Sequence, residues 1–342
     1  DALISDLQEE VPSAAGRPLQ SIFIGGGTPS LFSAEAIGRV LDAAQTLIGF
    51  ADDIEITMEA NPGTFEQEKF SGFRRVGVNR LSIGIQSFAD EQLTKLGRIH
   101  GRQEALNAVS VARIAGFDNI NLDLMHGLPG QTPEAAQADL QQAIDLRPEH
   151  ISWYQLTIEP NTEFYSRPPT LPIEDALADI QELGEALLAG AGYDQYEISA
   201  YARQGSVDRR SRHNLNYWRF GDYMGIGAGA HGKTTHVKEQ QLIRRRKTRL
   251  PAHYLENNRE FCASEEHLNA GDLALEFMMN ALRLCDGVPS AFFTQRAGLP
   301  LNALEPQLSE LRQRGLIETQ GTQLKTTDLG QRYLNEVLAQ FM

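Results

Sequence analysis

Strand-like and helix-like segments alternate over residues 21–201, and this alternation constrains the fold more than any other feature of the chain. Short apolar runs predict six strands, in the segments 21–27, 53–63, 79–87, 119–127, 150–158 and 195–201. Amphipathic runs predict helices after most of them, at about 33–48, 102–115, 132–146 and 174–191. Strands that alternate with helices pair in parallel through right-handed crossovers. The pattern therefore predicts an α/β barrel or part of one.

Unusual residues gather where these predicted strands end. The ends are Gly25 to Ser30, Glu59 to Pro62, Gln86 to Phe88, Asp123 to Gly127 and Gln155 to Asn161. In parallel α/β folds the chemistry lies at the carboxyl ends of the strands, so we expect one shared site. The three glycines 25–27 match neither a nucleotide P-loop nor a dinucleotide fingerprint. A structural turn is the plainer interpretation of the glycines taken alone.

Composition limits the classes of function. The chain has 342 residues with 45 acidic and 31 basic side chains, and its net charge of −14 argues against general nucleic-acid binding. No apolar run approaches the roughly 18 residues of a membrane span. The two cysteines, Cys262 and Cys285, are too few for a disulfide framework or a metal motif. We expect a cytoplasmic protein without a membrane span; peripheral membrane contact and a homodimer stay open.

The regular alternation stops after residue 203. Residues 204–271 are rich in aromatic side chains and glycine, and we interpret them as an extension that completes the site and leads into a linker. From about residue 272 a helix, a second helix near 302–314, a short hairpin and a last helix follow one another. This order predicts a small winged-helix-like domain at 272–342, after a first domain at 1–203.

Several motifs together resemble one known family. The segments IGGGTPS, EANPG, NRLSIGIQSF, LGRIHG, NLDLMHGLPGQT and YQLTIEPNT resemble those of the coproporphyrinogen III dehydrogenase-like (HemN-like) radical SAM proteins. The segment HNLNYWRFGDYMGIGAGAHGK narrows the resemblance to the HemW-like haem chaperones, a branch of that family. The resemblance covers nearly the whole chain. It implies a partial (βα)6 TIM-like radical SAM barrel whose first strand would precede residue 1, with a HemN C-terminal-like domain.

The resemblance also implies cofactors and the residues that hold them. S-adenosylmethionine would chelate one iron of a [4Fe–4S] cluster and lie against Gly26, Gly27 and Thr28. Glu59 matches a carboxylate near the amino or ribose groups, and Gln86 matches an amide that contacts the same ligand. Arg98 matches a guanidinium for the ligand's carboxylate, and Asp123 matches an acid for the ribose hydroxyls. The three cluster cysteines of the family would lie before residue 1. Taken alone, Gln86 is a common polar residue at the end of a strand, and the plainer interpretation of Arg98 is a surface ion-pair partner.

The HNLNYW motif implies a haem site. His213 would ligate the haem iron, with Tyr217 and Trp218 as apolar contacts. From the single sequence alone, a hydrogen-bonded packing residue is the plainer interpretation of His213. The basic runs at 208–213 and 244–249 are either solvated charge or partners for haem propionates.

These observations leave two main functions open. The first is a haem chaperone that binds S-adenosylmethionine, a [4Fe–4S] cluster and haem, and inserts haem into apoproteins. The alternative is an oxygen-independent coproporphyrinogen III oxidase, an enzyme of porphyrin biosynthesis. A regulator that binds DNA through the C-terminal domain is disfavoured, because residues 271–342 carry eight acidic and six basic side chains.

Overall fold

The computed structural model describes residues 1–342 except 65–66, 237–240 and 257–259. The chain divides into two compact units, each built from separated segments. The barrel unit comprises residues 21–41 and 53–211, and the terminal unit comprises 1–20, 42–52 and 212–342. The linear domain boundaries expected near 203 and 271 stay predictions.

A seven-stranded sheet contains all the predicted strands, in the order β1-β2-β3-β4-β5-β7-β6. Its strands are β1 Leu19–Ile24, β2 Phe50–Ala60, β3 Arg80–Gln86, β4 Ile120–His126, β5 His150–Gln155, β6 Tyr193–Glu197 and β7 Ala200–Arg203. The pairs β2–β3, β3–β4 and β4–β5 are parallel. The sheet confirms the predicted partial TIM-like α/β fold, and its consecutive strand order through β5 follows from the short crossovers.

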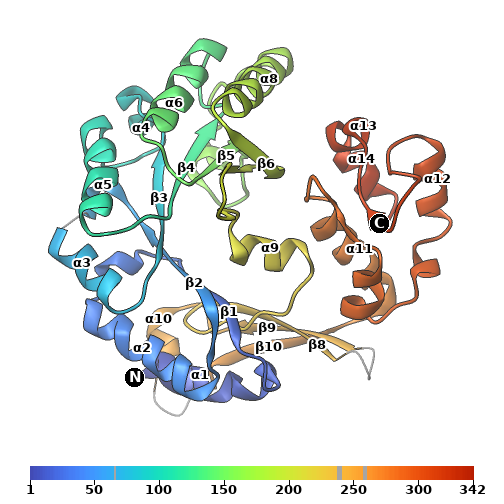
Figure 1. Ribbon diagram of the computed structural model, residues 1–342, viewed down its shortest axis with the longest axis horizontal. Coiled ribbons are helices and arrows are strands. Elements are labelled where there is room, and N and C mark those ends of the chain that lie inside the picture. Colours follow the sequence, from blue (N-terminus) through green and yellow to red (C-terminus); the bar gives the residue numbers. More distant parts are fainter. Residues whose placement is uncertain (65–66, 237–240, 257–259) are drawn as a thin grey trace. The chain divides into compact units, whose positions relative to one another are not determined.

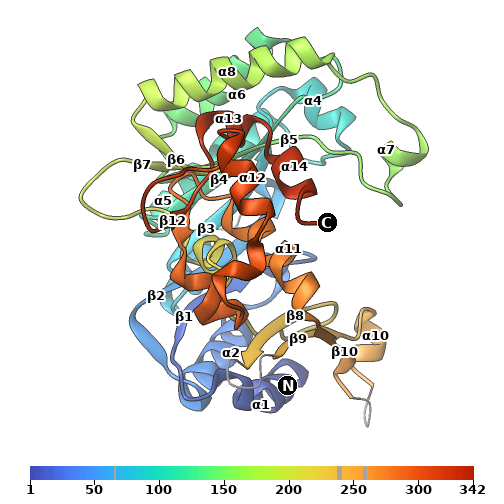
Figure 2. The ribbon, with the colours of Figure 1, turned by 90° about the vertical axis from the view of Figure 1, so that its right-hand side faces the viewer.

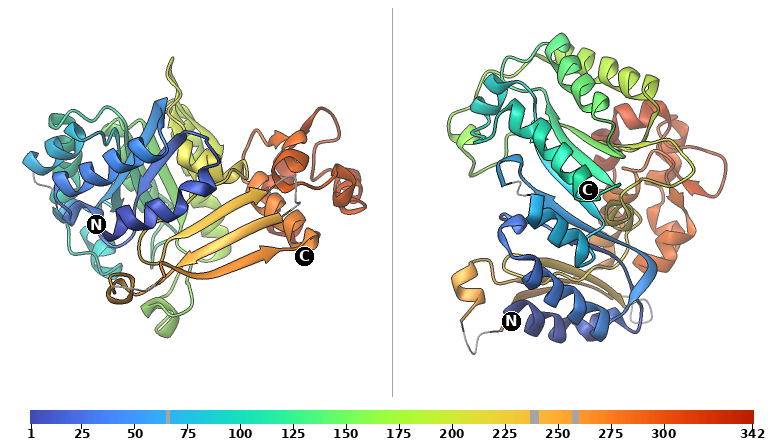
Figure 3. Two further views of the ribbon diagram at one scale, coloured as in Figure 1. Left: turned by 90° about the horizontal axis from the view of Figure 1, so that it is seen from below. Right: turned by 60° about the vertical axis from the view of Figure 1, so that its left-hand side comes forward.

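Helices cover one side of this sheet (Figures 1 and 3). They are α2 Ala34–Leu47, α3 Gln67–Arg75, α4 Asp90–Lys95, α5 Arg102–Ile114, α6 Pro133–Asp145 and α8 Glu174–Gly190, while α7 Glu163–Ser166 is a single turn. Helices α6 and α8 lie side by side (Figure 2). Six of the seven residues of β3 are buried, because a parallel sheet with helices beside it leaves little of a central strand in water. Within the described residues, no helix is both long enough and apolar enough to cross a membrane.

The predicted sixth strand at 195–201 is wrong in one respect. The structure folds this segment into a hairpin, in which β7 pairs antiparallel with both β6 and β5. The Glu197 carboxylate accepts hydrogen bonds from the backbone N–H and the hydroxyl of Ser199, at 3.2 and 3.1 Å. These bonds stabilise a tight turn within the segment 195–201. The alternation of apolar and polar residues that predicts a strand does not reveal such a turn.

The terminal unit contains elements that the sequence did not predict. Helix α1 Ala2–Ala14 precedes β1, and strands β8 His231–His236, β9 Gln241–Lys247 and β10 Cys262–Leu268 form an antiparallel sheet in the order β10-β9-β8. Figure 3 shows these three strands side by side. Two short helices, α9 Arg212–Trp218 and α10 Pro251–Tyr254, complete this part of the chain. Residues 204–271 are therefore more regular than the predicted extension and linker.

Residues 270–342 are mostly helical, as predicted. They contain α11 Ala270–Ala281, α12 Gln307–Gln313, α13 Asp328–Arg332 and α14 Leu334–Ala339, with single turns at Phe293–Ala297 and Leu301–Leu304 between them. Two further single turns, Pro29–Leu31 and Pro62–Thr64, belong to the barrel unit. The expected hairpin is reduced to one antiparallel bridge between Ile317 and Thr326. Strand β12 Gln323–Leu324 pairs instead with β11 Val288–Pro289. Phe277 and Phe293 meet edge to face at the core of this region, 5.1 Å between ring centres.

The basic run at 244–249 lies mostly on β9 and is paired with carboxylates, so the interpretation as solvated charge is wrong for most of it. Lys247 is buried, and its Nζ lies 2.5 Å from Asp6 Oδ1 and 2.6 Å from Glu10 Oε1, both on α1. Asp6 also accepts hydrogen bonds from the Tyr254 hydroxyl and the Gly227 N–H. Burial opposes the charge on Lys247, but the hydrogen bonds to Asp6 and Glu10 outweigh it and raise the pKa of Lys247.

This buried cluster makes a prediction about stability. Lys247→Met should lower the free energy of unfolding by about 3–5 kcal/mol, because it leaves the Asp6 and Glu10 carboxylates buried without their cation. Urea unfolding at pH 7 measures the loss. Arg246→Met, one position earlier in β9, removes an exposed ion pair with Glu266 and should cost less than about 1 kcal/mol. Equal losses in the two variants would contradict the assignment.

Candidate functional site

Polar side chains form a row across the parallel strands of the barrel unit. The strand register places Glu59 of β2 beside Ser82 of β3, Ser82 beside Asn121 of β4, and Asn121 beside His150 of β5. One step toward the strand ends, Asp123 lies beside Ser152. Because side chains alternate between the two faces of a strand, these residues share one face of the sheet. The row therefore joins two predicted site residues, Glu59 and Asp123.

The glycine-rich loop after β1 is shaped around Glu59. The Gly26 N–H donates to Glu59 Oε2 at 3.0 Å. A Cβ on Gly25 would lie 2.9 Å from the Glu59 carboxyl carbon and 2.7 Å from the Phe23 ring, so no side chain fits there. Gly26 and Gly27 have φ of +79° and +62°, which favours glycine. Thr28 follows in an extended conformation and starts a single turn at Pro29.

The two carboxylates are destabilised in their charged forms. Burial raises the pKa of Glu59, the Gly26 N–H lowers it, and the nearby Asp123 raises it again. Burial also raises the pKa of Asp123, against the opposing hydrogen bonds from Ser82 and Asn121. The strand register puts both carboxylates on the same face of the sheet. Two buried carboxylates there favour hydrogen-bond donors or a cation as partners.

Gln86 ends β3 in an unusual backbone conformation. Its φ is +67°, the left-handed region that non-glycine residues rarely adopt, and it is buried. The next residues are held by Asp139 of α6, which accepts from the Ser87 hydroxyl at 2.5 Å and the Phe88 N–H at 2.8 Å. The Gln86 amide oxygen accepts from the Tyr154 hydroxyl at 2.8 Å. Such backbone strain persists only where surrounding contacts hold it, and it is common at functional sites.

Tyr154 connects the predicted residues electrostatically. Burial, followed by the charges of Asp123 and Glu59, raises the pKa of Tyr154 to about 12, against the opposing effects of Arg98 and the hydrogen bond to Gln86. The phenol therefore lies within electrostatic range of Glu59, Asp123 and Arg98. Arg98 itself is exposed, and its role stays a prediction.

Two histidines near the strand ends are structural. His100 is buried and its Nε2 lies 3.1 Å from the Ile85 carbonyl oxygen. His126 stacks on Trp153 with 4.2 Å between ring centres, and burial lowers the pKa of His126 to about 4. Both are therefore neutral at pH 7.

His213 lies in the terminal unit, on α9. The ring of His213 meets the ring of Tyr217, four residues later on the same helix face, edge to face at 4.7 Å. Tyr217 in turn contacts Tyr223 at 4.5 Å, and burial raises the pKa of Tyr217 to about 12. The Trp218 ring lies under the guanidinium of Arg283, at 4.3 Å. His213 is half-buried and lies beside an aromatic cluster.

Sequence reasoning missed the residues that hold Asp123. The sequence motifs single out none of Ser82, Asn121, His150 and Tyr154, yet all four line the same face as Asp123. The available signal was alternation: polar residues recur at every second position, as 121 and 123 or 150, 152 and 154. In strands this apolar, a polar residue at every second position indicates a polar interior face.

The strand-end residues fit S-adenosylmethionine but not an iron–sulfur cluster. Two carboxylates, an amide and an exposed guanidinium match its cationic groups, hydroxyls and carboxylate, and a Cβ on Gly26 or Gly27 would meet no protein atom within 4 Å. For the cluster, no group of three or more potential metal ligands occurs among the described residues, and Cys262 and Cys285 both lie in the terminal unit.

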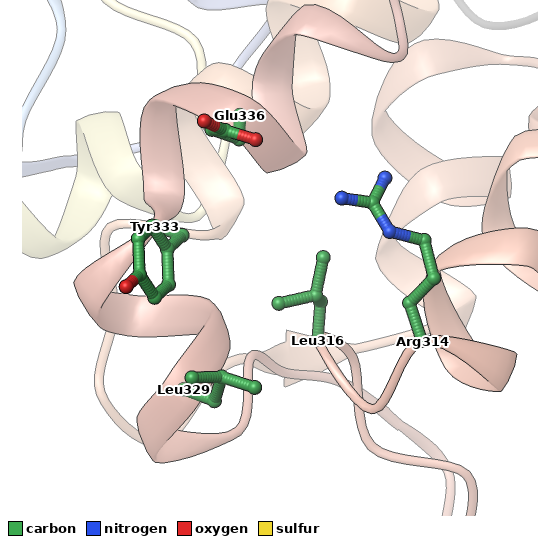
Figure 4. Close-up of a pocket in the computed structure, with 5 residues that line it drawn as sticks. All are labelled: Arg314, Leu316, Leu329, Tyr333 and Glu336. Carbon is green, nitrogen blue, oxygen red and sulfur yellow. The ribbon is translucent and has the colours of Figure 1, made fainter.

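A small pocket lies in the C-terminal region, away from these residues in the sequence. It has a volume of about 280 Å³ and is lined by Arg314, Leu316, Leu329, Tyr333 and Glu336 (Figure 4). None of these side chains was predicted as a site residue.

The raised pKa of Glu59 makes a prediction about pH. The folded protein binds this proton more tightly than the unfolded chain, so an ionised Glu59 lowers stability above its folded-state pKa. Glu59→Gln keeps an oxygen for the Gly26 N–H and removes the charge. At pH 7 the variant should unfold with an equal or larger free energy than the parent, and the difference should shrink as the pH falls to 4.5 and below.

Glu35→Gln is the control of opposite sign. Hydrogen bonds from its own backbone N–H and from Ser33 lower the pKa of Glu35. This variant should lose stability at pH 7, and the loss should disappear as the pH falls through the folded-state pKa. If Glu59→Gln follows the same course in urea unfolding from pH 3.5 to 7, Glu59 is not a strained carboxylate.

Comparison with known proteins places the chain in a family. The radical SAM superfamily matches residues 3–143, and the HemN C-terminal domain matches residues 268–333. The chain is 49% identical over 340 residues to heme chaperone HemW of Escherichia coli strain K12, covering 99% of this chain and 88% of that protein. It is 50% identical to heme chaperone HemW of Haemophilus influenzae, covering 99% and 87%.

A more distant relative and a solved structure also resemble this chain over its whole length. Heme chaperone HemW of Bacillus subtilis is 34% identical over 360 residues, covering all of this chain and 91% of that protein. The solved coproporphyrinogen III oxidase HemN of Escherichia coli superposes with a TM-score of 0.80 at 22% identity, covering all of this chain and 82% of that one. That likeness confirms the fold alone. Because HemW proteins match this chain at 49–50% identity over 99% of its length, the chain belongs to the HemW family of the radical SAM superfamily.

Proposed function

We propose that this chain is a haem chaperone that binds S-adenosylmethionine and haem and delivers haem to apoproteins. The observation that carries the proposal is 49–50% identity, across 99% of the chain, to two proteins named heme chaperone HemW. The alternative, coproporphyrinogen III oxidase, rests on a structural likeness at 22% identity, which supports the fold only.

The strand ends of the barrel unit would hold S-adenosylmethionine. Arg98 would pair with its carboxylate, since an exposed guanidinium offers a planar pair of donors. Glu59 and Asp123 would accept from its ammonium and ribose hydroxyls, and Gln86 would add an amide contact. The loop Gly26, Gly27 and Thr28 would lie against the methionine part. When bound, the cofactor supplies a sulfonium centre that can accept an electron.

Haem is the cargo of the proposed activity, and α9 would receive it. An imidazole nitrogen can ligate haem iron, and His213 lies beside an aromatic cluster. Tyr217 and Trp218 would contact the apolar macrocycle. Arg244 and Arg245 are paired with Glu276 and Glu265, so they are weaker candidates for the propionates than the sequence suggested.

Other partners belong to the same proposal. The apoproteins that accept haem would be cytoplasmic or membrane-associated, with the chaperone itself in the cytoplasm and without affinity for nucleic acid. A homodimer stays a prediction, which sedimentation of the full chain with and without haem tests.

Affinity for S-adenosylmethionine tests the barrel site. Glu59→Gln should bind it roughly ten times more weakly by isothermal titration, since a hydrogen bond to a charged group contributes about 1.5–3 kcal/mol. Glu91→Gln, on the exposed ion pair with Lys95, should bind as the parent does. Unchanged affinity in Glu59→Gln, with its stability intact, would remove Glu59 from the site.

Haem binding tests the assignment of His213. His213→Ala should shift the Soret band and weaken haem binding by about tenfold or more, equivalent to about 1.4 kcal/mol, because the iron loses its imidazole. His236→Ala, at the end of β8 and outside the motif, should change neither. If His213→Ala leaves the spectrum and the affinity unchanged, His213 is a packing residue.

Haem transfer separates the two candidate functions. Full-length protein loaded with haem should pass it to a haem-free acceptor protein, followed by the acceptor's own Soret band. The same protein, supplied with coproporphyrinogen III, a reductant and S-adenosylmethionine, should release no carbon dioxide. Decarboxylation without haem transfer would reverse the assignment.

A further inference from the structure

A continuous chain of hydrogen bonds crosses the interior of the barrel unit and ends on Asp123. Asn121, His150 and Tyr196 are 2%, 0% and 4% exposed. His150 Nδ1 lies 2.6 Å from Asn121 Oδ1, and His150 Nε2 lies 2.8 Å from the Tyr196 hydroxyl. The Ser211 N–H donates to that hydroxyl at 3.3 Å. None of these residues belongs to the sites predicted above.

The contacts of Asn121 determine how its amide is oriented. Its Oδ1 accepts from the Ser152 hydroxyl at 3.1 Å. Asn121 Nδ2 donates to Asp123 Oδ1 and to the Ser82 hydroxyl, both at 2.8 Å, and thereby uses both of its hydrogens. A flipped amide would place Asn121 Oδ1 against the Asp123 carboxylate, acceptor against acceptor. Asn121 Oδ1 therefore faces His150, and Nδ1 must carry the proton that it donates.

The remaining bonds then follow in one direction. With its proton on Nδ1, the neutral imidazole of His150 accepts at Nε2 from the Tyr196 hydroxyl, whose oxygen accepts from the Ser211 N–H. Burial keeps His150 neutral, since it lowers its pKa well below the usual range, with Arg80 acting in the same direction. Ser82 donates its own hydrogen to Asp123 Oδ2 at 2.8 Å. Every donor thus points toward the carboxylate.

We propose that His150, with Asn121 and Tyr196, is a positioning relay that orients the Asp123 carboxylate for the ribose hydroxyls of S-adenosylmethionine. Asn121 of the relay donates to Asp123 Oδ1, while the Ser82 hydroxyl donates to Oδ2 and Ser152 also hydrogen-bonds the carboxylate. Together these donors fix the carboxylate plane, and the remaining lone pairs can accept from a ligand. This inference rests on the proposed function of Asp123. It adds a role for His150, which makes no contact with a ligand and acts only through Asn121.

The relay also reaches the start of the haem motif. Ser211 is 1% exposed and is the last residue before α9, which carries His213. The same bonds that orient Asp123 therefore anchor the residue from which α9 begins.

Two variants of His150 separate positioning from simple packing. In His150→Asn the amide nitrogen takes the place of Nδ1 and can still donate to Asn121, whereas the longer side chain of His150→Gln reaches toward Tyr196 and loses that donor. By isothermal titration of the full-length protein, S-adenosylmethionine should bind His150→Asn within about threefold of the parent and His150→Gln about tenfold more weakly. In an Asp123→Ala background, His150→Gln should cause no further loss.

A spectroscopic measurement reads the tautomer of His150 in the parent protein itself. With ¹⁵N-labelled histidine, the His150 resonances should show a protonated Nδ1 and an unprotonated Nε2 throughout pH 5–8, and His150→Asn assigns them by their disappearance. A proton on Nε2 would overturn the relay whether or not S-adenosylmethionine binds. Equal losses of affinity in His150→Asn and His150→Gln, additive with Asp123→Ala, would likewise overturn it. If the parent does not bind S-adenosylmethionine but the tautomer is as expected, the proposed function fails and the orientation of Asp123 stands.

Discussion

The parallel register of β2 to β5 is the constraint on which the site depends. Each of these strands places a polar residue at the same level, so that Glu59, Ser82, Asn121 and His150 become neighbours although 23 to 39 residues separate each from the next. A shift of one residue in any pair would turn these side chains to the other face, among the helices. On the helix-covered side, Phe70 and Phe73 of α3 and Phe117 after α5 are buried and pack edge to face, and the polar side chains would have to displace such apolar contacts.

The register brings buried carboxylates and a strained backbone together at the strand ends, and the energetic cost of both is confined to that region. Carboxylates at the strand ends have raised pKa values because burial removes water from them, and Gln86 holds a left-handed backbone. Around them lie fully satisfied groups, such as Asp139 with Ser87 and Phe88, that keep the strained residues in position. A site assembled in advance loses less conformational entropy on binding than one that must form around its ligand.

Buried charge has a different role in the terminal unit. Lys247, Asp6 and Glu10 are all buried, and each charge has a partner of opposite sign within 2.6 Å. The cluster joins α1 at the start of the chain to β9 more than 200 residues later. A buried pair of this kind contributes little net free energy over an apolar contact, but it strongly disfavours arrangements in which one partner is left alone. Its role is therefore to specify which helix packs on this sheet.

The sequence by itself determined the α/β class, the consecutive order of the first five strands and the concentration of unusual residues at their carboxyl ends. These are consequences of local periodicity and short connections, which a single chain displays directly. Its motifs also indicated the family, which the full-length relatives confirm. Only the tertiary structure decided that 195–201 forms a hairpin, that the basic run of β9 faces the carboxylates of α1, and that His150 lies behind Asp123. Each of these depends on partners that are remote in sequence, and a residue's partner is set by strand register and helix packing rather than by its own neighbours.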